Sequence, residues 1–107
     1  MLTVAVPSAV LAVAKGQPET APLGETITSY YCGSCIRHLF SENSRKPGLT
    51  FIPAGLFDDT SWVKPCAHIW TRSAQPWVVI PSDVPTYRTQ PTDDSKLLGL
   101  WKSRIAD

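Results

Sequence analysis

The segment Ile27-Thr28-Ser29-Tyr30-Tyr31-Cys32-Gly33-Ser34-Cys35 decides the fold of this 107-residue chain. Its first five residues are mostly β-branched or aromatic, which is typical of a strand. The strand leads directly into a C-x-x-C pair around a glycine, and such a pair is one half of a tetrahedral zinc site. Arg37-His38-Leu39-Phe40 follows. We therefore predict a hairpin whose turn carries Cys32 and Cys35.

Other short apolar runs predict further strands, since many prolines and glycines favour strands and turns over long helices. These strands are expected over 2–6, 10–14, 49–54, 67–71 and 77–80, with loops over 19–25 and 41–48. Leu97, Leu98, Trp101 and Ile105 recur at helical spacing, which predicts a short amphipathic helix over 95–105. The predicted fold class is mainly β, with a short C-terminal α-helix.

Charge and cysteine content restrict the classes of partner. The net charge is +1, and Arg37, Arg45 and Lys46 are too few for a phosphate-binding surface, so we expect no nucleic acid. The apolar start has no charged leader region and is broken by Pro7, so we expect neither a secretion signal nor a membrane span. Three cysteines, an odd number, favour a reducing and cytoplasmic compartment over a disulfide framework.

A complete zinc site needs four ligands. Cys66-Ala67-His68 is a C-x-H pair, and on a strand both side chains would share one face. Cys32, Cys35, Cys66 and His68 together form a permitted structural zinc set. The alternatives are that Cys66 is a small core residue and that His68 is a half-buried strand residue. A redox dithiol is less suitable for the C-x-x-C, because strands rather than a helix flank it.

The candidate acid–base groups are His68, Asp58 and Asp59, together with Tyr30 or Tyr31. The two aspartates follow a glycine turn, where an alternative role is to cap backbone amides.

An aromatic group could line a ligand pocket or form the core of a small β domain. It consists of Trp62, Trp70, Trp77 and Tyr87.

Three segments in order resemble the glutathione-dependent formaldehyde-activating enzyme family, which includes the centromere-protein-V-like proteins. They are 27–35 followed by Leu39-Phe40, then Ala54-Gly55-Leu56-Phe57-Asp58-Asp59, and then the set from Pro65 through Ala67-His68-Ile69-Trp70 and Pro76-Trp77-Val78 to Asp83. The resemblance covers roughly residues 1–90 and implies a β-tent fold of zinc-linked antiparallel sheets.

The family also implies a plan for the site. A structural zinc is held by an N-terminal C-x-C and a later C-x-x-C, which Cys32 and Cys35 match. A second, catalytic zinc is held by a C-x-C-x-x-C run, which these 107 residues do not contain. We call the turn from Cys32 to Cys35 the knuckle. The family has a glycine directly after the second knuckle cysteine, and this chain has Ile36 there. A β-branched residue disfavours a positive φ, so altered knuckle geometry is expected. Cys66 is not a ligand position in the family.

The resemblance implies a carbon–sulfur lyase acting on a small molecule, a glutathione adduct, with zinc as cofactor. We expect a partial β-tent domain over 1–90 and a helical tail over 91–107. We expect this chain to be one of two forms of the family. It is a truncated member, or it is a reduced member in which a homodimer completes the sheet and joins two knuckles around the metal. Two alternatives remain: a metal-free isomerase or dehydratase using His68 and the aspartates in an aromatic pocket, and a non-catalytic binding or assembly module.

Overall fold

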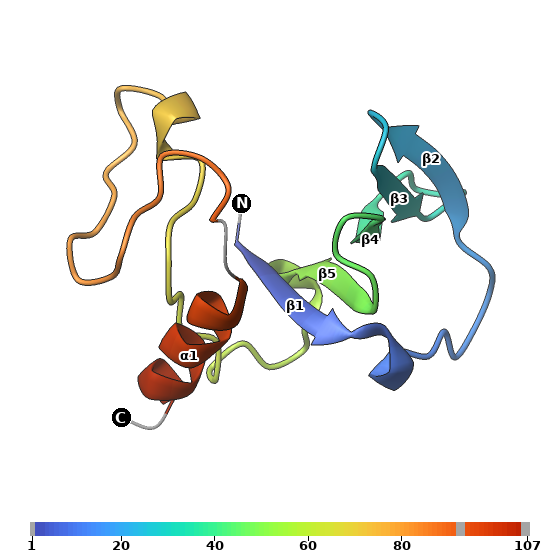
Figure 1. The fold of residues 1–107 in the computed structure, drawn as a ribbon. Helices are drawn as coiled ribbons and strands as arrows, with labels where there is room; N and C mark the ends of the chain where they lie inside the picture. The colour runs from blue at the N-terminus through green and yellow to red at the C-terminus, as the bar shows by residue number, and fades with distance from the viewer. Residues whose placement is uncertain (1, 92–93, 106–107) are drawn as a thin grey trace. The chain divides into compact units, whose positions relative to one another are not determined.

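The computed structural model describes residues 2–91 and 94–105 (Figure 1). It consists of two compact units, Met1–Thr60 and Ser61–Asp107. Each unit is described by itself. The predicted division at residue 90 stays a prediction.

The first unit is one five-stranded antiparallel sheet with the strand order β1-β5-β4-β3-β2 (Figure 1). Its strands are β1 (Thr3–Pro7), β2 (Glu19–Leu23), β3 (Ile27–Tyr31), β4 (His38–Asn43) and β5 (Leu49–Pro53). The predicted hairpin is therefore present, with the C-x-x-C between β3 and β4. The strands β2, β3 and β4 are consecutive neighbours, whereas β1 crosses to pair with β5. The prediction of a mainly β fold with a short C-terminal helix is confirmed.

Tight turns set the register of the sheet. Gly24 lies between β2 and β3 with φ 71, and Gly48 precedes β5 with φ 82. Glycine adopts these left-handed conformations without the steric penalty that a Cβ brings. The pairing of β3 with β4 shifts between Tyr30 and Tyr31, so the bulge lies directly before the knuckle. A bulge bends a strand and redirects the residues that follow it.

Two predictions in the first unit are wrong. Residues 10–14 do not form a strand, because η1 (Ser8–Val10) ends the first strand and no strand pairs with the segment that follows. Residues 19–25 are not simply a loop, since β2 lies within them and pairs with β3 from Glu19 to Leu23. Strand formation depends on the available partner as well as on propensity.

The predicted loop over 41–48 begins later than expected. The strand β4 continues to Asn43, and Ser41 and Glu42 pair with β5 as well as with β3. The polar composition of this segment suggested a loop, but a central strand can carry polar side chains where hydroxyls surround them.

In the second unit, the predicted strands over 67–71 and 77–80 are also wrong. His68 forms only an isolated bridge with Thr86, and η3 (Thr71–Ser73) follows. Trp70 before η3 has φ 57, a left-handed conformation that ends any extended run. The predicted helix is confirmed as α1 (Asp94–Ile105), although the side chain of Ile105 lies outside the description. In the described part of the chain, no helix has the length and apolar character of a membrane span.

Few hydrophobic side chains are buried. Among the described residues these are Ala54 and Val84, whereas Trp77 is 78% exposed. The aromatic group is therefore not a buried core. Two hydroxyl residues, Ser29 and Thr50, are buried in the sheet instead. The Thr50 side chain is 1% exposed, and its hydroxyl hydrogen-bonds to the Ser8 hydroxyl at 2.8 Å.

We expect this hydroxyl pair to show strong non-additivity. Ser8→Ala should lower the free energy of unfolding by about 1–3 kcal/mol, because it leaves the buried Thr50 hydroxyl unsatisfied. Thr50→Val in the same chain should remove that penalty, because neither polar group then remains. Urea unfolding of both single variants and the double variant measures the coupling. A double variant whose loss equals the sum of the two single losses would contradict this account.

Candidate functional site

The knuckle between β3 and β4 is closed by two backbone hydrogen bonds. The Cys32 N–H donates to the Arg37 carbonyl at 2.9 Å, and the Ile36 N–H donates to the Cys32 carbonyl at 2.7 Å. Both cysteines are free thiols, with Cys32 half-buried and Cys35 exposed. The backbone of the turn therefore presents two thiols at one end of the sheet.

The Cys32 sulfur is stabilised as a thiolate by the turn. The backbone N–H of Cys35 and then that of Ser34 hydrogen-bond to it, and they lower the pKa of Cys32, while burial acts weakly in the opposite direction. Because a metal binds the thiolate and not the thiol, these bonds favour the form that ligation requires.

Ile36 directly follows the second cysteine of the knuckle. Its φ is 62, and its side chain is 77% exposed. The chain adopts this left-handed conformation despite the β-branched side chain. Such a conformation costs on the order of 1–3 kcal/mol. The surrounding hydrogen bonds hold the strained residue in place. The expected alteration of the knuckle geometry stays a prediction.

A hydrogen-bonded serine–histidine pair joins the two strands on which the knuckle stands. The Ser29 hydroxyl and His38 Nδ1 lie 2.8 Å apart, and Ser29 is 9% exposed. The pair joins β3 to the first residue of β4, across the strands that carry the two ends of the turn. The sequence analysis missed it because the register shift between Tyr30 and Tyr31, which sets His38 opposite Tyr31 and so on the same face as Ser29, cannot be read from the sequence.

Glu19 of β2 lies against the knuckle. A Cβ added at Gly33 would lie 3.0 Å from Glu19 Cγ and 3.4 Å from Oε1. The absence of a side chain at Gly33 permits this close approach, and its φ does not lie in the left-handed region. The Glu19 side chain covers the turn that holds the cysteines.

The other two predicted ligands belong to the second unit. The Cys66 Sγ donates to the Leu97 carbonyl of α1 at 3.8 Å, which ties the helix to the preceding loop. His68 donates its backbone N–H to the Pro85 carbonyl and accepts from the Tyr87 N–H. Across residues 2–91 and 94–105, no three metal-ligating side chains gather at one place. The knuckle fits half of a zinc site, and the four-ligand set stays a prediction.

The predicted acid–base aspartates are on the surface. Asp58 and Asp59 are exposed and follow η2 (Ala54–Leu56). The other predicted acid, Tyr30, is placed differently. Its phenol hydrogen-bonds to the Glu42 carboxylate, and that bond, then burial and the negative charge of Glu42, raise its pKa. A raised phenol pKa favours the folded state below the ordinary tyrosine pKa, and this contribution is lost as the pH rises through the raised value.

The predicted aromatic group has two separate sets of contacts in the second unit. Trp62 packs edge-on against Trp101 of α1, with ring centroids 6.2 Å apart. Trp70 donates its indole N–H to Gln90 and carries the Arg72 guanidinium 5.1 Å above its ring. These contacts fix the exposed side chains of Trp62 and Trp70.

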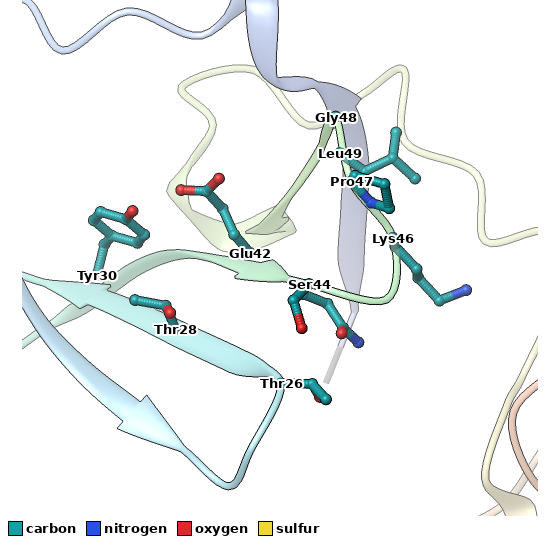
Figure 2. Close-up of a pocket in the computed structure, with 10 residues that line it drawn as sticks. Thr26, Thr28, Tyr30, Glu42, Ser44, Lys46, Pro47, Gly48 and Leu49 are labelled. Carbon is teal, nitrogen blue, oxygen red and sulfur yellow. The ribbon is translucent and has the colours of Figure 1, made fainter.

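A polar hollow of about 350 Å³ lies over the sheet of the first unit (Figure 2). It is lined by residues of two stretches of the chain, 26–30 and 42–49, namely Thr26, Thr28, Tyr30, Glu42, Asn43, Ser44, Lys46, Pro47, Gly48 and Leu49. The sequence analysis did not identify it, because the two stretches share no motif.

A family model, glutathione-dependent formaldehyde-activating enzyme, matches residues 1–73. The match covers more than half of the chain, so the protein belongs to this family. Neither the curated proteins nor the solved structures contain a match. The family match includes the five-stranded sheet, the knuckle, Cys66 and His68.

Replacing the strained residue should stabilise the first unit. Ile36→Gly removes a strain of about 1–2 kcal/mol and adds a glycine entropy cost of about 0.5–1 kcal/mol, so the free energy of unfolding should rise by about 1 kcal/mol. Arg37→Gly is the matched control, because Arg37 is exposed and has no positive φ. It should destabilise. Equal effects of the two substitutions in urea unfolding would show that Ile36 is not strained.

Crowding at Gly33 should depend on Glu19. Gly33→Ala should cost about 1 kcal/mol, because its methyl group meets Glu19 Cγ. In a Glu19→Ala background the same substitution should cost close to nothing, since the opposing atoms are gone. Urea unfolding of the four chains gives the coupling free energy. A cost at Gly33 that is unchanged by Glu19→Ala would mean that the turn itself excludes a side chain.

Alkylation of Cys32 should begin at lower pH in the folded chain than in the unfolded chain. The lowered pKa means that the thiolate favours the folded state at pH above the ordinary thiol pKa, and this contribution is lost as the pH falls through the lowered value. Iodoacetamide labelling followed by peptide mass spectrometry measures the midpoint, with the urea-unfolded chain as the reference. A folded midpoint at or above the unfolded one would refute the hydrogen bonds to sulfur.

Proposed function

We propose that this protein is a diverged carbon–sulfur lyase that acts on a small glutathione adduct. The observation that carries the proposal is the family match over residues 1–73, together with a knuckle whose backbone amides favour the thiolate form of Cys32. In the proposed reaction, the glutathione sulfur bonds to the carbonyl carbon of formaldehyde. The carbonyl π pair moves to oxygen, which takes up a proton as the thiol loses one. The reverse reaction breaks the carbon–sulfur bond.

The proposed roles of the chain's own residues are proton transfer and folding support. His68, Asp58 and Asp59 are the candidates to exchange protons with the thiol and the developing hydroxyl. Cys32 and Cys35 would hold a structural zinc, which when bound contributes folding free energy. That Cys66 and His68 complete its ligand set is a prediction from the sequence. The free thiols also agree with the proposed reducing cytoplasm.

A second candidate is a non-catalytic binding module on the same sheet. The polar hollow over β3 and β4 favours it, because the hollow offers hydrogen-bonding groups without a cysteine. In this candidate the knuckle is purely structural, and a homodimer could share one metal between two knuckles.

Exchange NMR with ¹³C-formaldehyde and glutathione tests the lyase proposal. We expect the purified chain to increase the exchange rate between free and adduct carbon above the uncatalysed rate. His68→Asn should reduce this increase in the exchange rate. The matched control is His38→Asn, which replaces the histidine that supports the knuckle. An exchange rate equal to the uncatalysed rate at every protein concentration would reject the lyase and leave the binding module.

Elemental analysis with native mass spectrometry tests the metal proposals. If Cys66 and His68 complete the zinc ligands, we expect one zinc per monomer. Both Cys66→Ser and His68→Asn should then lose this zinc. One zinc per dimer, unaffected by either substitution, would assign the metal to two shared knuckles. A folded protein without zinc would reject both.

A further inference from the structure

The two cysteines of the knuckle are held close together by one tight turn. The Ile36 N–H donates to the Cys32 carbonyl at 2.7 Å, and this bond closes the turn that contains both thiols. Tight turns bring their first and fourth Cα atoms within about 7 Å of each other. A disulfide spans about 4.4–6.8 Å between Cα atoms, so the backbone of the knuckle suits an S–S bond.

The two side chains are also in contact. The Cys35 side chain hydrogen-bonds to the Cys32 sulfur, which accepts further hydrogen bonds from the backbone N–H groups of Ser34 and Cys35. These bonds fix the Cys32 sulfur beside the Cys35 thiol. Formation of an S–S bond therefore needs rotation of two side chains and no movement between strands.

Access from solvent differs between the two thiols. Residues 33–37 are exposed, including Cys35, whereas Cys32 is half-buried. A reagent from solution therefore reaches the Cys35 sulfur first, with Cys32 as a second thiol behind it. An exposed cysteine beside a second, resolving cysteine is typical of sites that are oxidised reversibly.

The strands that flank the knuckle do not prevent this chemistry. In a dithiol that precedes a helix, the free backbone N–H groups of the helix N-terminus hydrogen-bond to a sulfur. The knuckle provides such N–H groups from Ser34 and Cys35. A helix is therefore not required for the contacts that the sulfur needs.

We propose that Cys32 and Cys35 are a redox-sensitive pair, which a small-molecule disulfide such as glutathione disulfide converts reversibly into an intramolecular disulfide. A cysteine in a disulfide offers no thiolate to a metal, so oxidation of the pair and zinc binding at the knuckle exclude each other. The inference is independent of the lyase proposal, because none of the residues proposed there for proton transfer takes part.

The oxidation consists of two thiol–disulfide exchange steps. The Cys35 thiol loses its proton to solvent, and its sulfur bonds to one sulfur of glutathione disulfide as the S–S bond of that molecule breaks. The released glutathione thiolate takes up a proton. The deprotonated Cys32 sulfur then bonds to the Cys35 sulfur, and the second glutathione leaves as a thiolate. Two electrons pass from the cysteines to glutathione disulfide, and excess glutathione reverses both steps.

Incubation of the full chain with glutathione disulfide, followed by acid quenching, N-ethylmaleimide labelling and peptide mass spectrometry, tests the proposal. Samples with and without EDTA account for bound metal. We expect a Cys32–Cys35 disulfide that glutathione reverses. Its closure from the mixed disulfide should be about tenfold faster than in the urea-unfolded chain, because the turn already holds the sulfurs together. A disulfide that forms only with EDTA also supports the proposal, since bound metal then holds the thiolates.

Cys32→Ser removes the second thiol, so a mixed disulfide with glutathione should accumulate at Cys35 in this variant and not in the parent chain. Cys66→Ser is the matched control and should close the disulfide at the parent rate, because the Cys66 thiol belongs to the second unit and donates to the Leu97 carbonyl. The proposal is overturned if no intramolecular disulfide forms in either sample, if Cys66 supplies one of its sulfurs, or if the urea-unfolded chain closes it equally fast.

Discussion

The turn from Cys32 to Arg37 is the constraint on which the first unit depends. Its two backbone hydrogen bonds join the end of β3 to the start of β4, and the Ser29–His38 pair lies just inside them. The sheet extends outward from this hairpin, since β2 pairs with β3 on one side and β5 pairs with β4 on the other. The same turn points two backbone N–H groups at the Cys32 sulfur. One local structure therefore organises the sheet and favours the thiolate form of Cys32.

Strain at Ile36 is the cost of keeping this geometry without the usual glycine. An exposed isoleucine gains little from burial, so nothing in its own contacts offsets the left-handed conformation. The compensation comes from the hydrogen bonds of the turn and from Glu19 packed over Gly33.

The sheet is held with unusually few buried apolar groups. Hydroxyl residues occupy central positions, where Thr50 bonds to Ser8 and Ser29 bonds to His38. Hydrogen-bonded polar groups can fill a protected layer, but they add less to stability than apolar burial does. The same polar surroundings allow a carboxylate at Glu42 in the middle of the sheet, and they create the polar hollow beside it.

The sequence alone determined the hairpin, the cysteine turn and the C-terminal helix, because each depends on residues close together in the chain. It also determined the family, through motifs that recur in a fixed order along residues 27–83. Local β-propensity identified β3 and β5, and helical spacing identified α1. Only the tertiary structure decided that 19–23 is a strand while 10–14 and 77–80 are not, because strand formation requires a partner that propensity does not specify. It also brought Tyr30 to Glu42 and Ser29 to His38. Those contacts depend on strand register, which is set across the sheet and not within any one segment.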